Sequence, residues 1–298
     1  MPAFLFPGQG TVRVGMGGWL RRAAAAKDVF EAADELFSEP ITPLCAQGPL
    51  DRLVATEHAQ RAVTVCNLAA LAVLRAEGHE PALVAGHSVG ELSALHAAGV
   101  LGLKQTLRLV ETRSRLMAAV GGTGGMSAVM GLPVGEVEEL AAAAERHGEP
   151  LVVGLENAAG HVVVSGAFPA LDRLAGLAPK VVPLKVGNAF HSPFMSEALP
   201  GWARAVLATP MRKPDLPVVP NVTAEPTIDL AVIRQALITQ LTARVRWAET
   251  MAHTVPLGLC VEAGDSKVLA GLARAAGVRC LSMTDPATPR RLARERAA

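Results

Sequence analysis

Short apolar runs alternate with longer amphipathic segments along most of the chain. Residues 3–6 and 82–86 are uninterrupted apolar runs of the length that a buried strand needs. Residues 27–37, 60–77 and 104–120 instead repeat apolar side chains at the helical period. Buried strands that alternate with amphipathic helices are typical of a parallel sheet covered by helices. The pattern therefore predicts an α/β fold.

The pattern changes between residues 126 and 186. The expected strands are 126–132, 151–158, 161–166 and 180–186, and the expected helices are 135–147 and 168–177. This order, β-α-β-β-α-β, is the ferredoxin-like pattern, and it follows the flexible run from Gly121 to Gly125. We predict a small subdomain at 123–188, inserted into a larger core formed by 1–122 and 189–298. Such an insertion leaves a cleft between the two parts.

Composition narrows the classes of function. Half of the 298 residues are hydrophobic, the formal net charge is +1, and aromatic residues make up only 3% with no tyrosine. No basic block or stacking surface favours nucleic acid or a membrane surface as a partner. The four cysteines are scattered, which predicts neither a metal site nor a disulfide framework, and no apolar run is long enough to span a bilayer. We expect a cytoplasmic protein that binds no metal.

One stretch carries the pattern of a nucleophile elbow. The apolar run 82–86 leads into Gly86-His87-Ser88-Val89-Gly90, and a helix is expected directly afterwards. Glycines at both ends permit a sharp turn that exposes the serine hydroxyl in front of a helix N-terminus. A chance match is the alternative, because the five-residue pattern is loose. The strand before it and the helix after it favour a catalytic serine.

A nucleophilic serine needs a base, and five histidines follow Ser88. They are His96, His147, His161, His191 and His253. His191 is favoured because it follows the last strand of the inserted subdomain, where the chain returns to the core beside the cleft. His87 is expected to point away from Ser88.

Arg113 falls among the apolar residues of the helix at 104–120. A guanidinium on an apolar face keeps its charge and needs an anion. That anion is either a carboxylate of the protein, giving an internal ion pair, or the carboxylate of a substrate. The sequence leaves both possibilities open.

Taken together, these motifs resemble the malonyl-CoA:acyl carrier protein transacylases and the acyltransferase domains of fatty acid and polyketide synthases. The resemblance covers nearly the whole chain and includes residues 6–10, 86–91, 111–113, 124–126, 156–157, 190–193, 220–222, 240–241, 245–247 and 267–269. It implies an α/β-hydrolase-like parallel-sheet core with an inserted ferredoxin-like subdomain, in agreement with the pattern above.

The resemblance also implies a role for each site residue. Ser88 is the nucleophile, His191 its base, and the main-chain carbonyl of Gln240 orients the imidazole. The backbone N–H groups of Gln9 and Val89 form the oxyanion hole. The acyl group is bound by residues that the family uses for its carboxylate and pocket: Arg113, Gln60, Met117, Asn157 and Phe190.

The implied reaction is ping-pong transfer of malonyl from coenzyme A to an acyl carrier protein. Coenzyme A thioester is a substrate, the phosphopantetheine belongs to the carrier protein, and no bound cofactor is expected. The bulky Phe190 predicts malonyl over methylmalonyl. The alternatives are a polyketide-synthase acyltransferase with another acyl unit, an acyl-thioester hydrolase with the same elbow, and a non-catalytic docking module. We expect a monomer.

Three places depart from the family's usual sequence near the expected site. Thr11-Val12-Arg13 follows Gly10 where Ser-Gln is common, and Asp265 stands where proline is common. Arg61 likewise replaces a usual proline. None of these changes removes a group that the resemblance assigns to catalysis.

Overall fold

The structure, a computed structural model, describes residues 1–297 and contains two five-stranded sheets. The first sheet has the order β10-β9-β1-β2-β7, and every neighbouring pair in it is parallel. Its strands are β1 (Ala3–Phe6), β2 (Leu83–Gly86), β7 (Val218–Val219), β9 (Leu259–Glu262) and β10 (Arg279–Ser282). Both β1 and β2 are fully buried, as expected for apolar runs in a covered parallel sheet.

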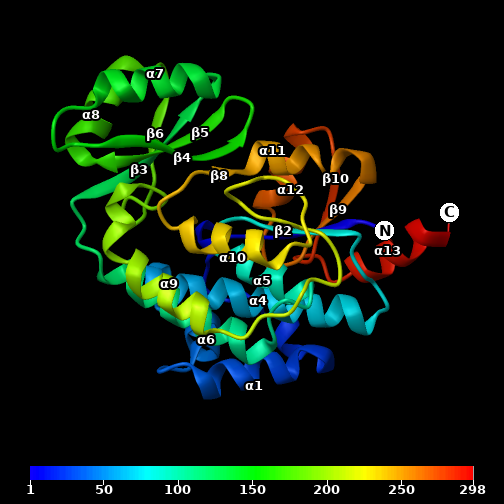
Figure 1. Cartoon of the computed structure of the whole chain (residues 1–298). Coiled ribbons are helices and arrows are strands. Elements are labelled where there is room, and N and C mark those ends of the chain that lie inside the picture. Colours follow the sequence, from blue (N-terminus) through cyan, green and yellow to red (C-terminus); the bar gives the residue numbers. More distant parts are fainter. Residues whose placement is uncertain (298) are drawn as a thin grey trace.

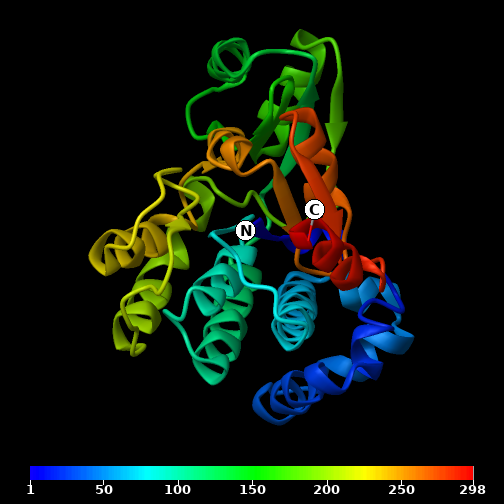
Figure 2. The same cartoon turned by 90° about the vertical axis from the view of Figure 1, so that its right-hand side faces the viewer.

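Helices surround this first sheet (Figures 1 and 2). They are α1 (Lys27–Leu36), α2 (Ile41–Gln47), α3 (Leu50–Val54), α4 (Thr56–Ala76), α5 (Gly90–Ala97), α6 (Leu103–Ala119), α9 (Leu199–Ala208), α10 (Leu230–Thr239), α11 (Trp247–Ala252), α12 (Val268–Ala275) and α13 (Thr288–Ala297). The longest, α4, is buried along most of its length, and it packs against α5 and α6. No helix within residues 1–297 combines the length and apolar character needed to cross a membrane.

The second sheet lies at the top of Figure 1 and has the order β6-β3-β5-β4-β8. Its elements are β3 (Gly124–Met130), α7 (Val134–Ala144), β4 (Leu151–Ala158), β5 (His161–Ala167), α8 (Phe168–Leu177), β6 (Val181–Pro183) and, from later in the chain, β8 (Val245–Arg246). The first four strands pair antiparallel in the order fourth, first, third, second. The predicted β-α-β-β-α-β pattern is thus confirmed and gives a ferredoxin-like sheet.

The two faces of this second sheet differ. Helices α7 and α8 cover one face, where Val129, Val153 and Val164 belong to a separate apolar cluster. On the other face, Ala128 and Val163 join the main core of the molecule. The alternation along each strand therefore buries the sheet on both sides.

Two strands end earlier than the apolar runs at 180–186 and 218–222 predict, and one further strand was not expected. β6 ends at Pro183, well short of residue 186, and β7 ends at Val219, directly before Pro220. A proline has no N–H for the ladder, which explains both early ends. The two-residue strand β8 was not expected, and it adds to β4 in parallel.

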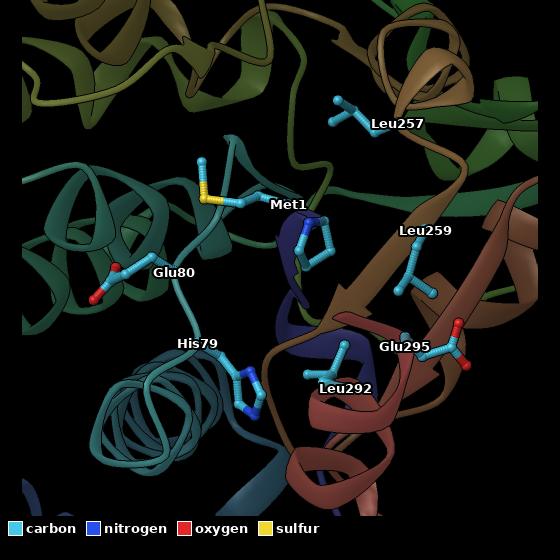
Figure 3. A pocket seen from close by; sticks show the side chains of 8 residues that line it. Met1, His79, Glu80, Leu257, Leu259, Leu292 and Glu295 are labelled. Carbon is cyan, nitrogen blue, oxygen red and sulfur yellow. The ribbon is translucent and has the colours of Figure 1, made fainter. Parts of the chain in front are cut away.

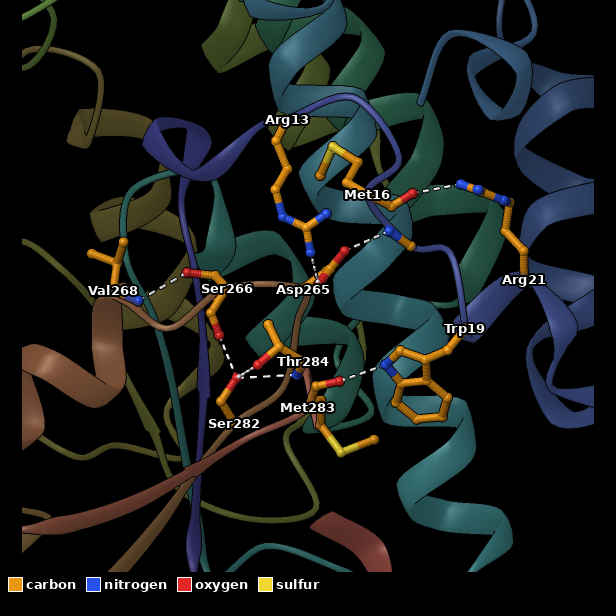
Figure 4. Close-up of polar contacts among 11 residues, drawn as sticks. Arg13, Met16, Trp19, Arg21, Asp265, Ser266, Val268, Ser282, Met283 and Thr284 are labelled. Carbon is orange, nitrogen blue, oxygen red and sulfur yellow. Dashed lines mark hydrogen bonds and ion pairs between the residues drawn. The ribbon is translucent and has the colours of Figure 1, made fainter. Parts of the chain in front are cut away.

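The loop after β1 is fastened to the loop after β9 (Figure 4). Arg13 Nη2 donates to Asp265 Oδ1 at 2.6 Å, and the Gly17 N–H donates to Asp265 Oδ2 at 2.6 Å. Trp19 Nε1 adds a hydrogen bond to the Met283 carbonyl, 2.8 Å long. Arg13 and Asp265, two of the sequence departures noted above, are therefore one ion pair.

Candidate active site

Ser88 lies in the sharp turn between β2 and α5, at the carboxyl edge of the first sheet. Its φ of 52° lies in the left-handed region that side chains rarely adopt. A Cβ at Gly86 would lie 2.0 Å from Gly90, and one at Gly90 would lie 2.1 Å from the Phe6 carbonyl oxygen. Only glycine fits at either end of this turn, so the predicted elbow is present.

Asn221 holds the turn from the neighbouring strand. Its Oδ1 accepts a hydrogen bond from the Ser88 N–H at 2.7 Å, and its Nδ2 donates to the Gly86 carbonyl at 2.6 Å. Asn221 is fully buried. Both bonds go to the backbone, which fixes the strained conformation and leaves the serine hydroxyl free.

The hydroxyl of Ser88 meets the imidazole of His191. Ser88 Oγ lies 2.8 Å from His191 Nε2, while His191 Nδ1 lies 2.9 Å from the Gln240 carbonyl oxygen and 3.2 Å from that of Ala243. A carbonyl only accepts, so the ring proton is on Nδ1 and Nε2 is free to accept from Ser88. This is the arrangement of a nucleophile and its general base.

His191 is kept neutral by its surroundings. Burial, followed by the positive charge of Arg113, lowers the pKa of His191 to about 3. The Gln240 carbonyl acts in the opposite direction but is the weaker influence. A neutral imidazole is able to take a proton at any pH near neutrality.

Arg113 lies beside this pair, on α6, and is only 1% exposed. Its Nη1 donates to Gln60 Oε1 at 2.6 Å, and its Nη2 donates to Gln240 Oε1 at 2.9 Å and to Ser88 Oγ at 3.3 Å. All three acceptors are neutral, and no carboxylate of residues 1–297 forms an ion pair with Arg113 within 4.0 Å. The internal ion pair that the sequence left open is therefore absent from the described part of the chain.

Gln60 joins several of the expected acyl-binding residues. Besides accepting from Arg113, it donates from Nε2 to Gln9 Oε1 at 3.2 Å and to Met117 Sδ at 3.4 Å. Gln60, Met117 and Arg113 are all buried. They form a layer directly behind Ser88.

Gln9 and Val89 each begin a helical turn next to Ser88. Gln9 opens a 3-10 turn after β1, and Val89 is the N-cap residue of α5. The first N–H groups of a helix have no partner within that helix and favour a negative charge. The oxyanion hole at Gln9 and Val89 that the resemblance implies is compatible with these positions and stays a prediction.

A cavity of about 250 Å³ opens in front of Ser88. Of the predicted site residues, Gln9, Ser88, Asn157, Phe190 and His191 line it. Its apolar wall comes mainly from the second sheet and the chain that follows it, through Met126, Leu155, Val163, Leu184 and Val186. The remaining predicted residues, Gln60, Val89, Arg113, Met117 and Gln240, are buried behind this lining.

His87 does not point away from the site as expected, since it lines the same cavity as Ser88. Its Nε2 lies 2.8 Å from Asn157 Oδ1, and its ring packs against Trp247 in an edge-to-face contact with a centroid distance of 5.2 Å. Asn157 reaches it because the register of β4 against β5 shifts between Glu156 and Ala158. A bulge of this kind re-aims a side chain and is not visible in the sequence.

The other histidines have different surroundings. His96 Nδ1 lies 2.9 Å from the carbonyl oxygen of Leu101, which follows α5 in the chain, and His147 is exposed. His253 lies beside Glu225, and His161 lines the cavity near Asn157. Among these, only His191 contacts Ser88.

A second cavity, of about 240 Å³, lies at the opposite edge of the first sheet (Figure 3). It is lined by residues at the start of β1 and β9 and by α13, including Pro2, Leu259 and Leu292. His79, its one imidazole, is bound through Nε2 to the Pro289 carbonyl oxygen. The lining contains no serine or cysteine, so this cavity has no nucleophile for the histidine to activate.

Known proteins resemble this chain along almost its whole length. Residues 3–261 match the family described as acyl transferase domain. The malonyl CoA-acyl carrier protein transacylase of Synechocystis is 36% identical over 276 residues, which cover 91% of this chain and 92% of that protein.

Solved structures of similar proteins point to the same family. The acyl-carrier-protein S-malonyltransferase of Bartonella henselae superimposes with a TM-score of 0.94, at 33% identity and full coverage of both chains. A malonyl-transacylase solved with a type II polyketide synthase acyl-carrier protein gives 0.91, at 31% identity, covering 96% of this chain and 97% of that one. The predicted fold, a hydrolase-like core with a ferredoxin-like subdomain, is confirmed by these structures.

Proposed function

Because the chain belongs to the acyl transferase family and is an acyltransferase, we propose that it moves malonyl from coenzyme A to an acyl carrier protein. The observation that carries this proposal is the buried guanidinium of Arg113, which lies 3.3 Å from Ser88 Oγ and has only neutral acceptors. A buried cation that makes no direct ion pair favours an acyl group that brings its own carboxylate. Acetyl and fatty acyl groups bring none.

The first half of the reaction loads Ser88. His191 Nε2 takes the proton of Ser88 Oγ as the oxygen attacks the thioester carbonyl carbon, and the oxyanion lies between the Gln9 and Val89 N–H groups. The carbon–sulfur bond then breaks, and the imidazolium returns its proton to the leaving thiolate of coenzyme A. A malonyl ester of Ser88 remains.

The second half reverses these steps with a different thiol. The phosphopantetheine thiol of the carrier protein gives its proton to His191 and attacks the ester carbonyl, and Ser88 leaves as the free hydroxyl. Coenzyme A is thus a substrate, the phosphopantetheine belongs to the partner, and the proposal includes no resident cofactor. We also propose that the enzyme works in the cytoplasm and as a monomer.

The carboxylate of malonyl has a place beside Arg113. The hydrogen bond from Arg113 Nη2 to Ser88 Oγ is 3.3 Å long and the weakest of the three that Arg113 makes. Arg113 Nη1 donates one of its two hydrogens to Gln60, which leaves the other for a substrate. A substrate carboxylate that takes these two hydrogens forms a bidentate pair. The same pair fixes the ester relative to His191, which we propose limits attack by water.

Two alternatives remain distinct from this proposal. A polyketide-synthase acyltransferase has the same chemistry and differs in carrier partner or acyl unit, as the complex with a polyketide carrier protein illustrates for that relative. A hydrolase with the same elbow has no use for a buried arginine beside the serine. The second alternative is therefore the weaker one.

Intact-protein mass spectrometry tests the proposal directly. The protein is incubated briefly with malonyl-, methylmalonyl- or acetyl-CoA, with Ser88→Ala as the control. We expect a malonyl adduct on the unaltered chain only, and its transfer to an added holo carrier protein. Free malonic acid without a carrier adduct would instead indicate a hydrolase.

The same measurement tests the acyl preference. Phe190 is 6% exposed and lines the cavity, so an α-methyl branch has little room beside it. We expect methylmalonyl loading to be at least tenfold slower than malonyl loading and to recover in Phe190→Ser. Comparable loading of both thioesters would contradict this part of the proposal.

A further inference from the structure

A buried carboxylate that the proposed chemistry does not use lies behind the elbow. Glu91, in the first turn of α5, is only 1% exposed. Its Oε2 accepts hydrogen bonds from the Asn221 N–H and from Gln240 Nε2, both at 2.8 Å, while Oε1 has no hydrogen-bond partner among residues 1–297. A buried acid with one oxygen unpaired carries a free-energy cost that calls for an explanation.

The first partner of Glu91 supports the elbow. Asn221 is held through its backbone N–H, and its side chain binds the Ser88 N–H and the Gly86 carbonyl. This contact needs only a hydrogen-bond acceptor at position 91. A neutral amide provides such an acceptor as well as a carboxylate does.

The contact of Glu91 with its second partner, Gln240, depends on the negative charge of the Glu91 carboxylate. Gln240 donates from Nε2 to Glu91 and accepts at Oε1 from Arg113 Nη2. Gln240 Nε2 also donates to the Ser88 carbonyl oxygen, at 3.2 Å. An ionised Glu91 only accepts and lies closer, at 2.8 Å, so it is the stronger of the two acceptors that turn the amide nitrogen toward them and the amide oxygen toward Arg113. The opposite orientation would place the amide N–H₂ against the guanidinium, donor against donor.

Gln240 is also the residue whose main-chain carbonyl binds His191 Nδ1, so its side chain and its backbone serve two different groups of the site. The Gln240 side chain is the one hydrogen-bond partner of Arg113 that comes from α10 and the turn after it, within residues 1–297. The orientation of one amide therefore decides whether Arg113 is held from this side.

We propose that Glu91 is a positioning residue for acyl selectivity: it orients the Gln240 amide so that Arg113 is held where the carboxylate of the acyl group binds. This inference rests on the proposed function, and Glu91 itself touches neither the substrate nor the reacting atoms. It assigns to the last residue of the Gly86-to-Glu91 motif a role distinct from that of the elbow.

Glu91→Gln tests the inference because the side chain keeps its shape and an acceptor for Asn221. The amide at position 91 is both donor and acceptor, so only the longer bond to the neutral Ser88 carbonyl still favours one orientation of the Gln240 amide. We expect kcat/KM for malonyl-CoA at pH 8 to fall at least tenfold, and the ratio of malonyl to acetyl loading to fall with it. Labelling of Ser88 by diisopropyl fluorophosphate, which carries no carboxylate, should change less than twofold.

Glu262→Gln is the matched control. Glu262 is a fully buried carboxylate at the end of β9 in the same sheet, also with an unpaired Oε1, and its Oε2 accepts from the Ala270 N–H of α12. It should leave the malonyl-to-acetyl ratio unaltered, whatever its effect on stability. A fall in that ratio in both variants would show a general effect of buried charge and overturn the inference.

The remaining outcomes are also decisive. Equal losses of malonyl loading and of fluorophosphate labelling in Glu91→Gln would mean that Glu91 only supports the elbow. An unchanged or increased malonyl-to-acetyl ratio would mean that Glu91 does not hold Arg113 through Gln240. A failure of the unaltered chain to load malonyl would instead contradict the proposed function and is recognised before any variant is compared.

Discussion

Two residues of the site keep a backbone conformation that costs about 1 to 3 kcal/mol. Ser88 and His191 have φ values of 52° and 56°, and among residues 1–297 Ala224 is the only other non-glycine residue with positive φ. The hydrogen bonds of Asn221 offset the strain at Ser88, and those of Gln240 and Ala243 hold His191. Strain is thus found at the two residues whose side chains meet at 2.8 Å, Ser88 and His191.

The low pKa of His191 leads to a prediction about pH. Since burial and Arg113 lower this pKa to about 3, the imidazole stays neutral far below its ordinary range. We expect the rate of Ser88 labelling by diisopropyl fluorophosphate to fall less than twofold between pH 7 and pH 5. A histidine with an ordinary pKa near 6.5 would lose about 97% of its neutral form at pH 5. A fall of that size would contradict the assigned surroundings of His191.

Glu91 leads to a prediction about stability. Burial raises its pKa to about 7, so the folded chain binds the proton more tightly than the unfolded chain, in which the pKa is near 4.5. The stability contributed by the protonated form is present below pH 4.5 and is lost as the pH rises through 7. We expect Glu91→Gln to raise stability by about 1 to 3 kcal/mol at pH 8 and by less at pH 5.

Thermal unfolding of both proteins at the two pH values measures this difference. An equal gain at pH 5 and pH 8 would show that Glu91 is already ionised in the folded protein at pH 5, so that burial does not raise its pKa. The expected combination, a more stable protein that selects malonyl less well, is the trade between stability and function that buried charges often carry.

The residues of the site differ in how far the sequence predicted them. Ser88 was predicted from local pattern and Arg113 from its place on an apolar helix face, because both signals lie within one element. His191 was favoured by its place in the chain order. The contacts of Asn221, Glu91 and His87 were not predicted, since they depend on side-chain directions between segments more than 60 residues apart.

At the scale of elements, long periodic segments were predicted well. β4 and α8 begin and end at the predicted residues, and α6 lies within one residue of its predicted bounds at each end. The two-residue strand β8 was not predicted, because so short a run has no measurable period and exists only through its pairing with β4. The bulges of β4 are likewise a product of pairing.

The ion pair between Arg13 and Asp265 supports a prediction about the two loops that it connects. Asp265 is buried and binds both Arg13 and the Gly17 N–H, whereas the Arg13 side chain is 53% exposed. We expect Asp265→Ala to cost about 2 to 3 kcal/mol, because it leaves a buried N–H unpaired, and Arg13→Ala to cost less than about 1 kcal/mol. The double variant measures the coupling between them.

The same variants should affect activity through the loop that carries Gln9. The loop from Gly8 to Arg13 is held by the ion pair between Arg13 and Asp265. Because Asp265→Ala releases this loop, we expect it to lower malonyl loading several-fold. Arg52→Ala, which breaks an exposed pair with Glu39 at 2.5 Å, is the matched control and should leave loading unchanged. Full activity in Asp265→Ala would show that the ion pair between Arg13 and Asp265 serves stability alone.

At the scale of the whole molecule, the cavity owes its shape to two sheets that share one core. The first sheet presents Ser88 at its carboxyl edge, and the second sheet supplies most of the apolar wall. The chain joins them at the entry to β3, after β6, and again through β8. The division at residues 122 and 188 stays a prediction.

A shared core predicts that the two sheets unfold together. Val163 of β5 faces the main core, while its neighbour Val164 faces the cluster beneath α7 and α8. Of the three tryptophans, Trp19 and Trp202 belong to the larger part, and Trp247 directly follows β8 of the second sheet, so the fluorescence reports mainly on the larger part.

Val164→Ala leaves a cavity in the cluster beneath α7 and α8 and should lower the free energy of unfolding by about 1 to 3 kcal/mol. We therefore expect it to lower the midpoint of thermal unfolding measured by tryptophan fluorescence together with the midpoint measured by far-ultraviolet circular dichroism. Val29→Ala in α1, which packs in the main core, is the matched variant and should lower both midpoints in the same way. An unchanged tryptophan midpoint in Val164→Ala would mean that the second sheet unfolds separately. In that case the cavity wall would open independently of the elbow, and water would reach the Ser88 ester without unfolding the core.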